Sequence, residues 1–156
     1  MEIVLARLDN RLLHGIVATQ WVQHSRCDRL MIIDDETATD LTKKEIMRIA
    51  KPGKLPLSII TLDTAINNFK AGKYDGKRIF VVTKKPDVLK DLDDAGINID
   101  EITIGGSAGG PEETIRLSKR YACTPEEKAD LDELARRGLN LYSQYIPADA
   151  KEPFKA

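Results

Sequence analysis

The chain has 156 residues, of which 42% are hydrophobic and 31% are charged, and its formal net charge at pH 7 is −1. A chain of this length can bury a substantial core, so we interpret residues 1–156 as a single domain with a polar tail from about Pro147. The balanced charge indicates no nucleic-acid or membrane partner, although it leaves room for a local basic patch. Cys27 and Cys123 stand apart from any metal-ligand spacing, so we expect no metal site.

Short apolar runs alternate along the chain with helix-like segments. Proline, glycine and N-cap residues mark several ends: one helix must stop before Pro52, Gly96 follows another, and Thr124 caps a third. In chain order we expect a strand over 2–8, a helix over 15–24, a strand over 28–33, a helix over 40–50, a strand over 55–61, a helix over 63–71, a strand over 77–83, a helix over 86–95, a strand over 101–104, a glycine-rich loop over 105–111, an edge strand over 116–122, a helix over 125–137 and a last strand over 139–146.

Strands that alternate with helices of this length predict βαβ units and an α/β fold. Near-continuous apolar strands, such as LMII and IFVV, suit a sheet that is covered on both faces. We therefore predict a single-domain α/β fold with a mainly parallel sheet and helices on both faces. Ligands of such sheets bind at the carboxyl ends of the strands. The site is therefore expected in the segments 9–14, 34–36, 61–63, 83–85 and 105–110.

Three polar residues, Asp9, Arg11 and His14, lie within six positions of one another between the first strand and the first helix. A lone histidine is more often a surface or helix-capping residue, but its neighbours here favour chemistry. Arg11 can pair with an anion, and the first amides of the following helix attract negative charge. Asp9 can bond one imidazole nitrogen and leave the other as a nucleophile. The cluster is typical of covalent phosphoryl transfer without a metal.

The glycine-rich stretch from Gly105 to Gly110 allows two interpretations. Bare glycines usually form turns, but a row of amides with Ser107 can also lie near a phosphoryl group or a docking partner. The stretch lacks the Gly-Lys-Ser/Thr of a Walker loop, and no helix opens directly on it. We therefore expect neither ATP nor NAD, and no cofactor.

Acidic and basic residues also follow later strands, and they raise an alternative function. Asp34 and Asp35 follow the second predicted strand, Asp63 the third, and Lys84 and Lys85 the fourth. A receiver-like signalling domain uses such residues to bind magnesium and to form an aspartyl phosphate. Receivers carry the acid pair after the first strand, however, whereas here it follows the second. Acids that are solvated or cap helices are the simpler interpretation.

The stretch ARLDNRLLHGIVATQW, residues 6–21, closely resembles the N-terminal signature of the IIB component of the mannose-type (mannose–fructose–sorbose) phosphoenolpyruvate-dependent sugar phosphotransferase system. The matching positions are Arg7, Asp9, Arg11, Leu12, His14, Gly15, Val17 and Trp21. The stretches IIDDETATD, ITIGGSAGG and LARRGLNLYSQYIPAD extend the resemblance over nearly the whole chain. Two positions depart from the pattern: Asn10 replaces a usual aspartate, and Ile16 replaces a common glutamine.

The resemblance implies a mixed, mainly parallel sheet and a phosphocarrier function. By position, His14 accepts a phosphoryl group at Nδ1 from a phosphohistidine of the IIA component. The group then passes to a sugar carried by the IIC and IID membrane components, which places the protein in the cytoplasm, peripherally at the inner face of the membrane. Asp9 and Arg11 position the ring and steady the phosphoryl group. Contacts with phosphate or a partner are further expected at Arg7, Asn10, Gly15, Asp35, Gly106 and Ser107.

Overall fold

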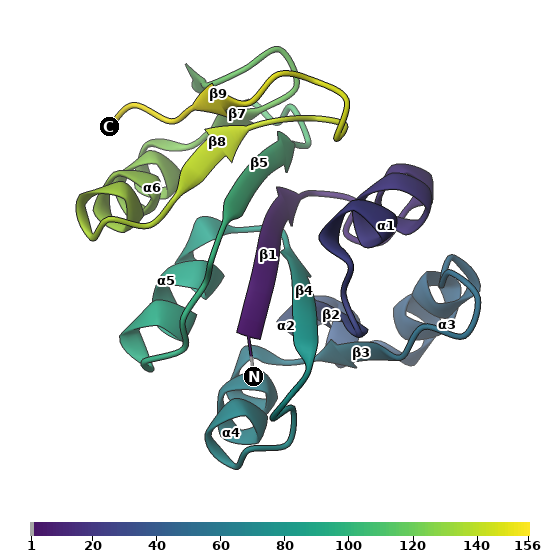
Figure 1. Ribbon diagram of the computed structural model, residues 1–156. Coiled ribbons are helices and arrows are strands. Elements are labelled where there is room, and N and C mark those ends of the chain that lie inside the picture. Colours follow the sequence, from purple (N-terminus) through teal and green to yellow (C-terminus); the bar gives the residue numbers. More distant parts are fainter. Residues whose placement is uncertain (1) are drawn as a thin grey trace.

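The computed structural model, which describes residues 2–156, is built on one large sheet. Its strands are β1 (Glu2–Asp9), β2 (Arg29–Ile33), β3 (Leu57–Ile60), β4 (Arg78–Thr83), β5 (Ile102–Gly106), β8 (Leu141–Ser143) and β9 (Glu152–Pro153). Their spatial order is β3-β2-β4-β1-β5-β8-β9, so β1 lies near the middle (Figure 1). Every pair is parallel except β8 with β9. The predicted mainly parallel, mixed sheet is confirmed.

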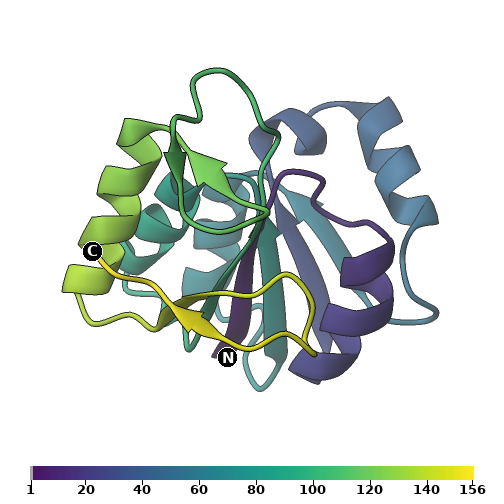
Figure 2. The ribbon, with the colours of Figure 1, turned by 90° about the horizontal axis from the view of Figure 1, so that it is seen from above.

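Helices cover both faces of the sheet, as predicted. They are the π-helical turn η1 (Val17–Trp21) and helices α1 (Val22–Ser25), α2 (Asp35–Ala38), α3 (Leu41–Ile49), α4 (Leu62–Lys70), α5 (Pro86–Asp94) and α6 (Pro125–Arg136). One core cluster joins the sheet to α4, α5 and α6, and the other joins it to η1 and α3 around the buried Trp21. Figure 2 shows these helical layers on either side of the strands. None of the helices in residues 2–156 combines the length and apolar character that crossing a membrane needs.

The chain changes direction across the sheet at β1. After β1 it moves outward to β2 and β3, and later it returns through β4 and continues on the other side of β1 with β5 and β8. The segment after β1 leads to η1 on one face, whereas the segment after β5 leads to α6 on the other face. Open α/β sheets bind ligands at such a switch point, outside the carboxyl ends of the strands. The turn from Asn10 to His14 lies at this point.

The structure differs from the predicted elements around β5. Gly105 and Gly106 are buried residues of β5 and not part of a loop, because β5 extends far enough for Gly106 to pair with Asp9 of β1. The predicted edge strand over 116–122 is instead a small hairpin. Its two-residue strands, β6 (Ile115–Arg116) and β7 (Ala122–Cys123), pair only with each other.

The C-terminal segment also differs from prediction, because it returns to the sheet. The last parallel strand is shorter than the predicted span over 139–146, and the residues after Pro147 form a loop that leads into β9. β9 pairs with β8, and the ring of Phe154 packs against the core. The predicted polar tail is therefore attached to the edge of the sheet by backbone hydrogen bonds and by one aromatic side chain.

Candidate functional site

A tight turn after β1 gathers polar side chains around Asp9. The backbone carbonyl of Asp9 accepts the N–H of Leu12 at 3.1 Å, and its Oδ1 accepts the N–H of Arg11 at 3.0 Å. Leu12 has a left-handed backbone, with φ of 57°, a conformation that costs a non-glycine residue about 1–3 kcal/mol. Burial of Leu12 and Leu13 in the core offsets this cost. The turn thereby leaves Arg11 and His14 beside the Asp9 carboxylate.

The imidazole of His14 lies between a carboxylate and a guanidinium. Its Nε2 is 2.9 Å from Oδ2 of Asp9, and its Nδ1 is 3.2 Å from Nη2 of Arg11. A carboxylate accepts hydrogen bonds and a guanidinium only donates them. The ring proton therefore belongs on Nε2, and Nδ1 carries the lone pair. The result is a histidine whose Nδ1 is the nucleophilic nitrogen, with a cation beside it that can contact an incoming anion.

The Asp9 carboxylate keeps its negative charge although it is buried. Burial alone raises the pKa of this carboxyl, but the hydrogen bond from His14, the charge of Arg7 and the N–H of Arg11 together outweigh it and hold the pKa below its usual value. At neutral pH an anion therefore lies next to the His14 ring. Such an anion can stabilise a positive charge on the ring.

Arg7 holds this arrangement from inside the protein. Its side chain is fully buried, and its Nε donates to Oδ2 of Asp9 at 3.2 Å. Its two Nη atoms donate to the backbone carbonyls of Gln144 and Tyr145, each at 2.9 Å, and its Cζ lies 4.7 Å from the ring centroid of Trp21. The contact of Arg7 with phosphate or a partner stays a prediction; in this structure the buried guanidinium is engaged within the core.

Gly105 leaves the space that the Arg7 guanidinium fills. A Cβ at position 105 would lie 2.5 Å from Cζ of Arg7 and 2.8 Å from the backbone oxygen of Leu8. Neither group can move without breaking buried hydrogen bonds. We therefore expect Gly105→Ala to lower the free energy of unfolding by about 1–3 kcal/mol, measured by urea denaturation. The matched control is Gly15→Ala, where a Cβ meets nothing within 4 Å. An unchanged urea midpoint for Gly105→Ala would contradict this packing.

Tyr145 belongs to the site although the sequence analysis did not single it out. Its backbone carbonyl accepts Nε1 of Trp21 at 2.9 Å as well as the Nη of Arg7. Its hydroxyl accepts Nη2 of Arg11 at 3.4 Å, the same nitrogen that contacts His14. Tyr145 comes shortly after β8, at the carboxyl edge of the sheet. The predicted last strand over 139–146 placed Tyr145 inside the strand, so the carboxyl-end rule could not find it; the strand in fact ends at Ser143.

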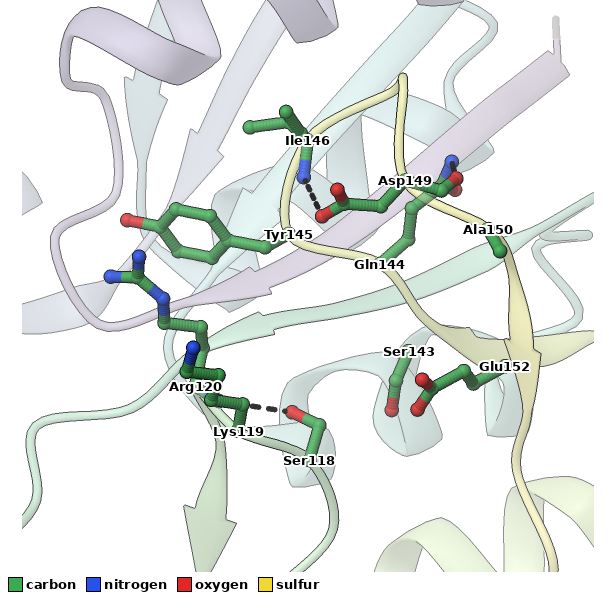
Figure 3. A pocket seen from close by; sticks show the side chains of 10 residues that line it. All are labelled: Ser118, Lys119, Arg120, Ser143, Gln144, Tyr145, Ile146, Asp149, Ala150 and Glu152. Atoms are coloured by element: carbon green, nitrogen blue, oxygen red, sulfur yellow. Dashed lines mark hydrogen bonds between the residues drawn. The ribbon is translucent and has the colours of Figure 1, made fainter.

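A cavity of about 540 Å³ lies beside Tyr145, between the turn of the β6–β7 hairpin and the segment that joins β8 to β9. Figure 3 shows the Arg120 side chain reaching toward the Tyr145 ring, and its Cζ is 4.4 Å from the ring centroid. Charged side chains of both signs line the cavity, namely Lys119, Arg120, Asp149 and Glu152. The Tyr145 side chain is therefore shared between this cavity and the hydrogen bonds around His14.

Three of the remaining predicted residues lie close to the His14 cluster. The N–H of Asn10 donates to the carbonyl of Gly106 at 3.0 Å, which fixes the start of the turn against β5. Gly106 is buried at the end of β5, whereas Gly15 is exposed where the helix after His14 begins. The structure thus brings these backbones together, and their contact with phosphate stays a prediction.

Ser107 and Asp35 do not join the hydrogen bonds around His14. The Ser107 hydroxyl accepts the N–H of Ala122 at 2.9 Å and attaches the hairpin to the end of β5. Oδ1 of Asp35 accepts the N–H of Leu62 at 2.9 Å, and Asp34 caps α2 through Thr37. These acids thus act as helix-capping groups. Within residues 2–156 no three His, Cys, Asp or Glu side chains are grouped to hold a metal ion.

Comparison with known proteins identifies the family. The family model described as "PTS system sorbose subfamily IIB component" matches residues 3–156. The sorbose-specific EIIB component of Lacticaseibacillus casei is 30% identical over 149 residues, which are 96% of this chain and 90% of that protein. The mannose-specific EIIAB component of Escherichia coli (strain K12) is 26% identical over 151 residues, which are 97% of this chain and 46% of that protein.

A solved structure agrees with these relatives. The IIBSor domain of the sorbose permease from Klebsiella pneumoniae has a TM-score of 0.92 to this chain at 26% identity, and the match covers 98% of this chain and 93% of that one. The family predicted from residues 6–21 is confirmed, and the receiver-like alternative gains no support. The chain belongs to the sorbose subfamily of phosphotransferase-system IIB components, the mannose-type IIB proteins of sugar phosphotransfer.

Proposed function

We propose that this chain is a phosphocarrier in which His14 receives a phosphoryl group at Nδ1 from a phosphohistidine of a IIA component and passes it to a sugar. The observation that carries the proposal is the 2.9 Å contact between Nε2 of His14 and Oδ2 of Asp9. It keeps the proton on Nε2 and the lone pair on Nδ1, where Arg11 lies ready to contact an anion. The lowered pKa of Asp9 keeps its carboxylate charged for this task.

In the first step, Nδ1 of His14 attacks the phosphorus in line. A new N–P bond forms while the N–P bond of the donor breaks, and the electron pair of the broken bond returns to the donor imidazole. Nε2 of His14 keeps its proton, so the ring becomes an imidazolium beside the Asp9 carboxylate. Arg11 and the first amides of the following helix stabilise the phosphoryl oxygens. Transfer between two imidazoles is nearly isoenergetic, so no metal is required.

In the second step, a sugar hydroxyl oxygen attacks the phosphorus. The bond from phosphorus to Nδ1 breaks, its electron pair restores the Nδ1 lone pair, and the hydroxyl proton leaves to water. The phosphorylated ring leaves more easily when it carries a positive charge. Asp9 must therefore stabilise this imidazolium, but not so strongly that transfer to the sugar becomes slow. The hydrogen-bonded, partly exposed setting of His14 suits such a reversible carrier.

The partners of the proposed function are a IIA component and the sugar-loaded IIC and IID membrane components. The EIIAB relative of Escherichia coli supports a IIA partner, since its name joins both parts in one protein of which this chain matches 46%. Relatives named for sorbose and for mannose match this chain over nearly its full length, so we assign sugar choice mainly to the membrane components. The chain then works in the cytoplasm, peripherally at the membrane.

An intact-mass experiment tests the proposal. The protein is incubated with phosphoenolpyruvate, enzyme I, the histidine phosphocarrier protein and a mannose-type IIA component, and the control omits the IIA component. We expect a gain of one phosphoryl group that requires IIA, disappears in mild acid and maps to His14. A gain from a small acyl phosphate with magnesium that survives His14→Ala would contradict the proposal. So would no gain with several IIA components that each phosphorylate their own IIB.

Tyr145 positions Arg11 in the proposed mechanism. In this structure Nη2 of Arg11 contacts Nδ1 of His14, so it must move aside before phosphorus can approach that nitrogen. The Tyr145 hydroxyl also accepts Nη2 of Arg11 and can hold the guanidinium beside the site when it moves. We expect Tyr145→Phe to slow phosphoryl acceptance several-fold with little change in the apparent KM for IIA, measured by rapid-quench kinetics. The matched control is Tyr142→Phe, because the hydroxyl of Tyr142 donates to Glu101 and not to the site. Equal rates for both variants would remove Tyr145 from the mechanism.

A further inference from the structure

Helix α3 presents apolar side chains to solvent. Leu41, Ile46 and Ile49 are 73%, 63% and 85% exposed, and they are the exposed large apolar side chains of the part of the chain that the structure describes. Met47, on the opposite side of the same helix, packs against the core. The helical repeat places all three on the outward half of α3: Ile46 and Ile49 are neighbours one turn apart, and Leu41 lies further along, separated from Ile49 by Glu45. We call these three side chains the apolar stripe.

Basic residues outnumber acidic ones in α3 and in the turn after it, although Lys43 is paired with Glu36 of α2. Residues 40–54 contain five basic side chains and two acidic ones, namely Lys43, Lys44, Arg48, Lys51 and Lys54 against Asp40 and Glu45. Glu45 is 2.8 Å from Arg48 and is neutralised by it, and the Asp40 side chain caps the helix by accepting the N–H of Lys43. Lys44, Lys51 and Lys54 have no acidic partner within ion-pair distance among residues 2–156. The flank of α3 is therefore locally basic although the whole chain is slightly acidic.

We propose that α3 and the turn after it are a docking surface for an anionic lipid bilayer. A basic helix with exposed aliphatic side chains fits the interfacial region, where the side chains insert among the acyl chains and the cations contact anionic headgroups. A second copy of this chain fits less well, because two α3 surfaces in contact would bring their basic side chains together and these would repel each other. Three aliphatic side chains also offer much less than the 20–30 residues per partner of a standard protein interface.

The position of α3 is compatible with the phosphoryl site. The helix starts at the carboxyl edge of the sheet, after β2, and runs back toward the start of β3. Figure 2, which looks from above, shows α3 at the margin of the molecule, far from β9. Met47 Sδ accepts the N–H of Leu13 at 3.3 Å, so the inner side of α3 also supports the turn that carries His14. A bilayer against the outer side of α3 leaves the carboxyl edge, with His14, free for protein partners.

Vesicle flotation tests this surface with the full chain. The protein is mixed with vesicles of phosphatidylcholine alone or of phosphatidylcholine with phosphatidylglycerol. We expect binding to the anionic vesicles that weakens with added salt. The double variant Lys51→Glu with Lys54→Glu should lower the partition coefficient at least tenfold, and Ile49→Ser should lower it about tenfold. The matched control is Lys70→Glu with Lys73→Glu, the same charge change in and just after α4 on the other face, which should bind as the unchanged protein does.

Each of the other outcomes overturns the proposal. Equal binding to both kinds of vesicle, or equal loss in the control variant, would mean that α3 has no special affinity for anionic lipid. If the α3 variants float normally but accept phosphoryl groups more slowly from a IIA component, the stripe is a protein contact. Flotation needs no phosphoryl donor, so its failure is distinct from failure of the phosphocarrier assignment. Circular dichroism of each variant checks that the fold is kept.

Discussion

The His14→Ala variant is expected to lose phosphoryl acceptance completely while keeping its fold. In the proposed mechanism the imidazole supplies the attacking nitrogen, and alanine offers no atom that can take its place. The side chain belongs to neither core cluster, but it is only 11% exposed and its ring is bonded to Asp9, so its removal should lower the free energy of unfolding by about 1–3 kcal/mol without unfolding the protein. The measurement is the intact mass after incubation with the complete donor mixture, together with a urea denaturation curve.

The matched control for this variant is His24→Ala. His24 is exposed on α1 and contacts the Trp21 ring edge-on, with 5.4 Å between ring centroids. The His24→Ala variant should accept one phosphoryl group, as the unchanged protein does. If His14→Ala still gained an acid-labile phosphoryl group, or if His24→Ala lost it, then the nucleophile would have been assigned to the wrong residue.

The Asp9→Asn variant is expected to slow phosphoryl acceptance by about two to four orders of magnitude. The amide oxygen can still accept the Nε2 proton of His14, but it carries no charge to stabilise the imidazolium. Quench-flow measurement of phosphohistidine formation gives the rate. Asp34→Asn is the matched control. Asp34 follows β2 and caps α2, so this variant should leave the rate unchanged. A rate for Asp9→Asn within a few-fold of the unchanged protein would contradict the role of Asp9.

The same substitution should destabilise the protein, because it leaves Arg7 buried without its counter-charge. Removing one partner of a buried ion pair costs about 3–5 kcal/mol. The cost depends on pH, since the Asp9 pKa lies below its usual value in the folded protein. The stability that the ionised carboxylate provides is present above the ordinary aspartate pKa of about 3.9 and is lost as the pH falls through the lowered value. The urea midpoints of the two proteins should therefore converge in strong acid.

Much of the fold was predictable because local signals agree with tertiary packing. The apolar runs of β2 and β4 are continuous because both faces of these strands are covered. Thr124 caps α6 as expected, and it exchanges hydrogen bonds with Glu127 in a capping box. The failures were short elements that depend on distant partners. The two-residue strands β6 and β7 carry no periodic pattern, and the glycines of β5 look like loop residues because only pairing with β1 makes them a strand.

The contacts among Asp9, Arg11 and His14 were predictable from the sequence, and the groups that support them were not. Asp9, Arg11 and His14 are neighbours in sequence, so their contacts follow from one turn. The surroundings of Arg7 could not be inferred locally, because its carbonyl partners lie 137 and 138 positions away. Arg7, a charged residue within the first strand, was therefore interpreted as a contact for phosphate or a partner, whereas the structure buries it in the core.

The bonds from Arg7 to the carbonyls of Gln144 and Tyr145 have a consequence for the order of biosynthesis. Arg7 leaves the ribosome before the carbonyl groups that anchor it, which lie 137 and 138 positions further along the chain. Until the strand before Gln144 has been synthesised and has joined the sheet, the guanidinium has no carbonyls to bind and the Asp9 carboxylate is not held in place. In the proposed function, nascent chains that have not reached Tyr145 should therefore accept no phosphoryl group.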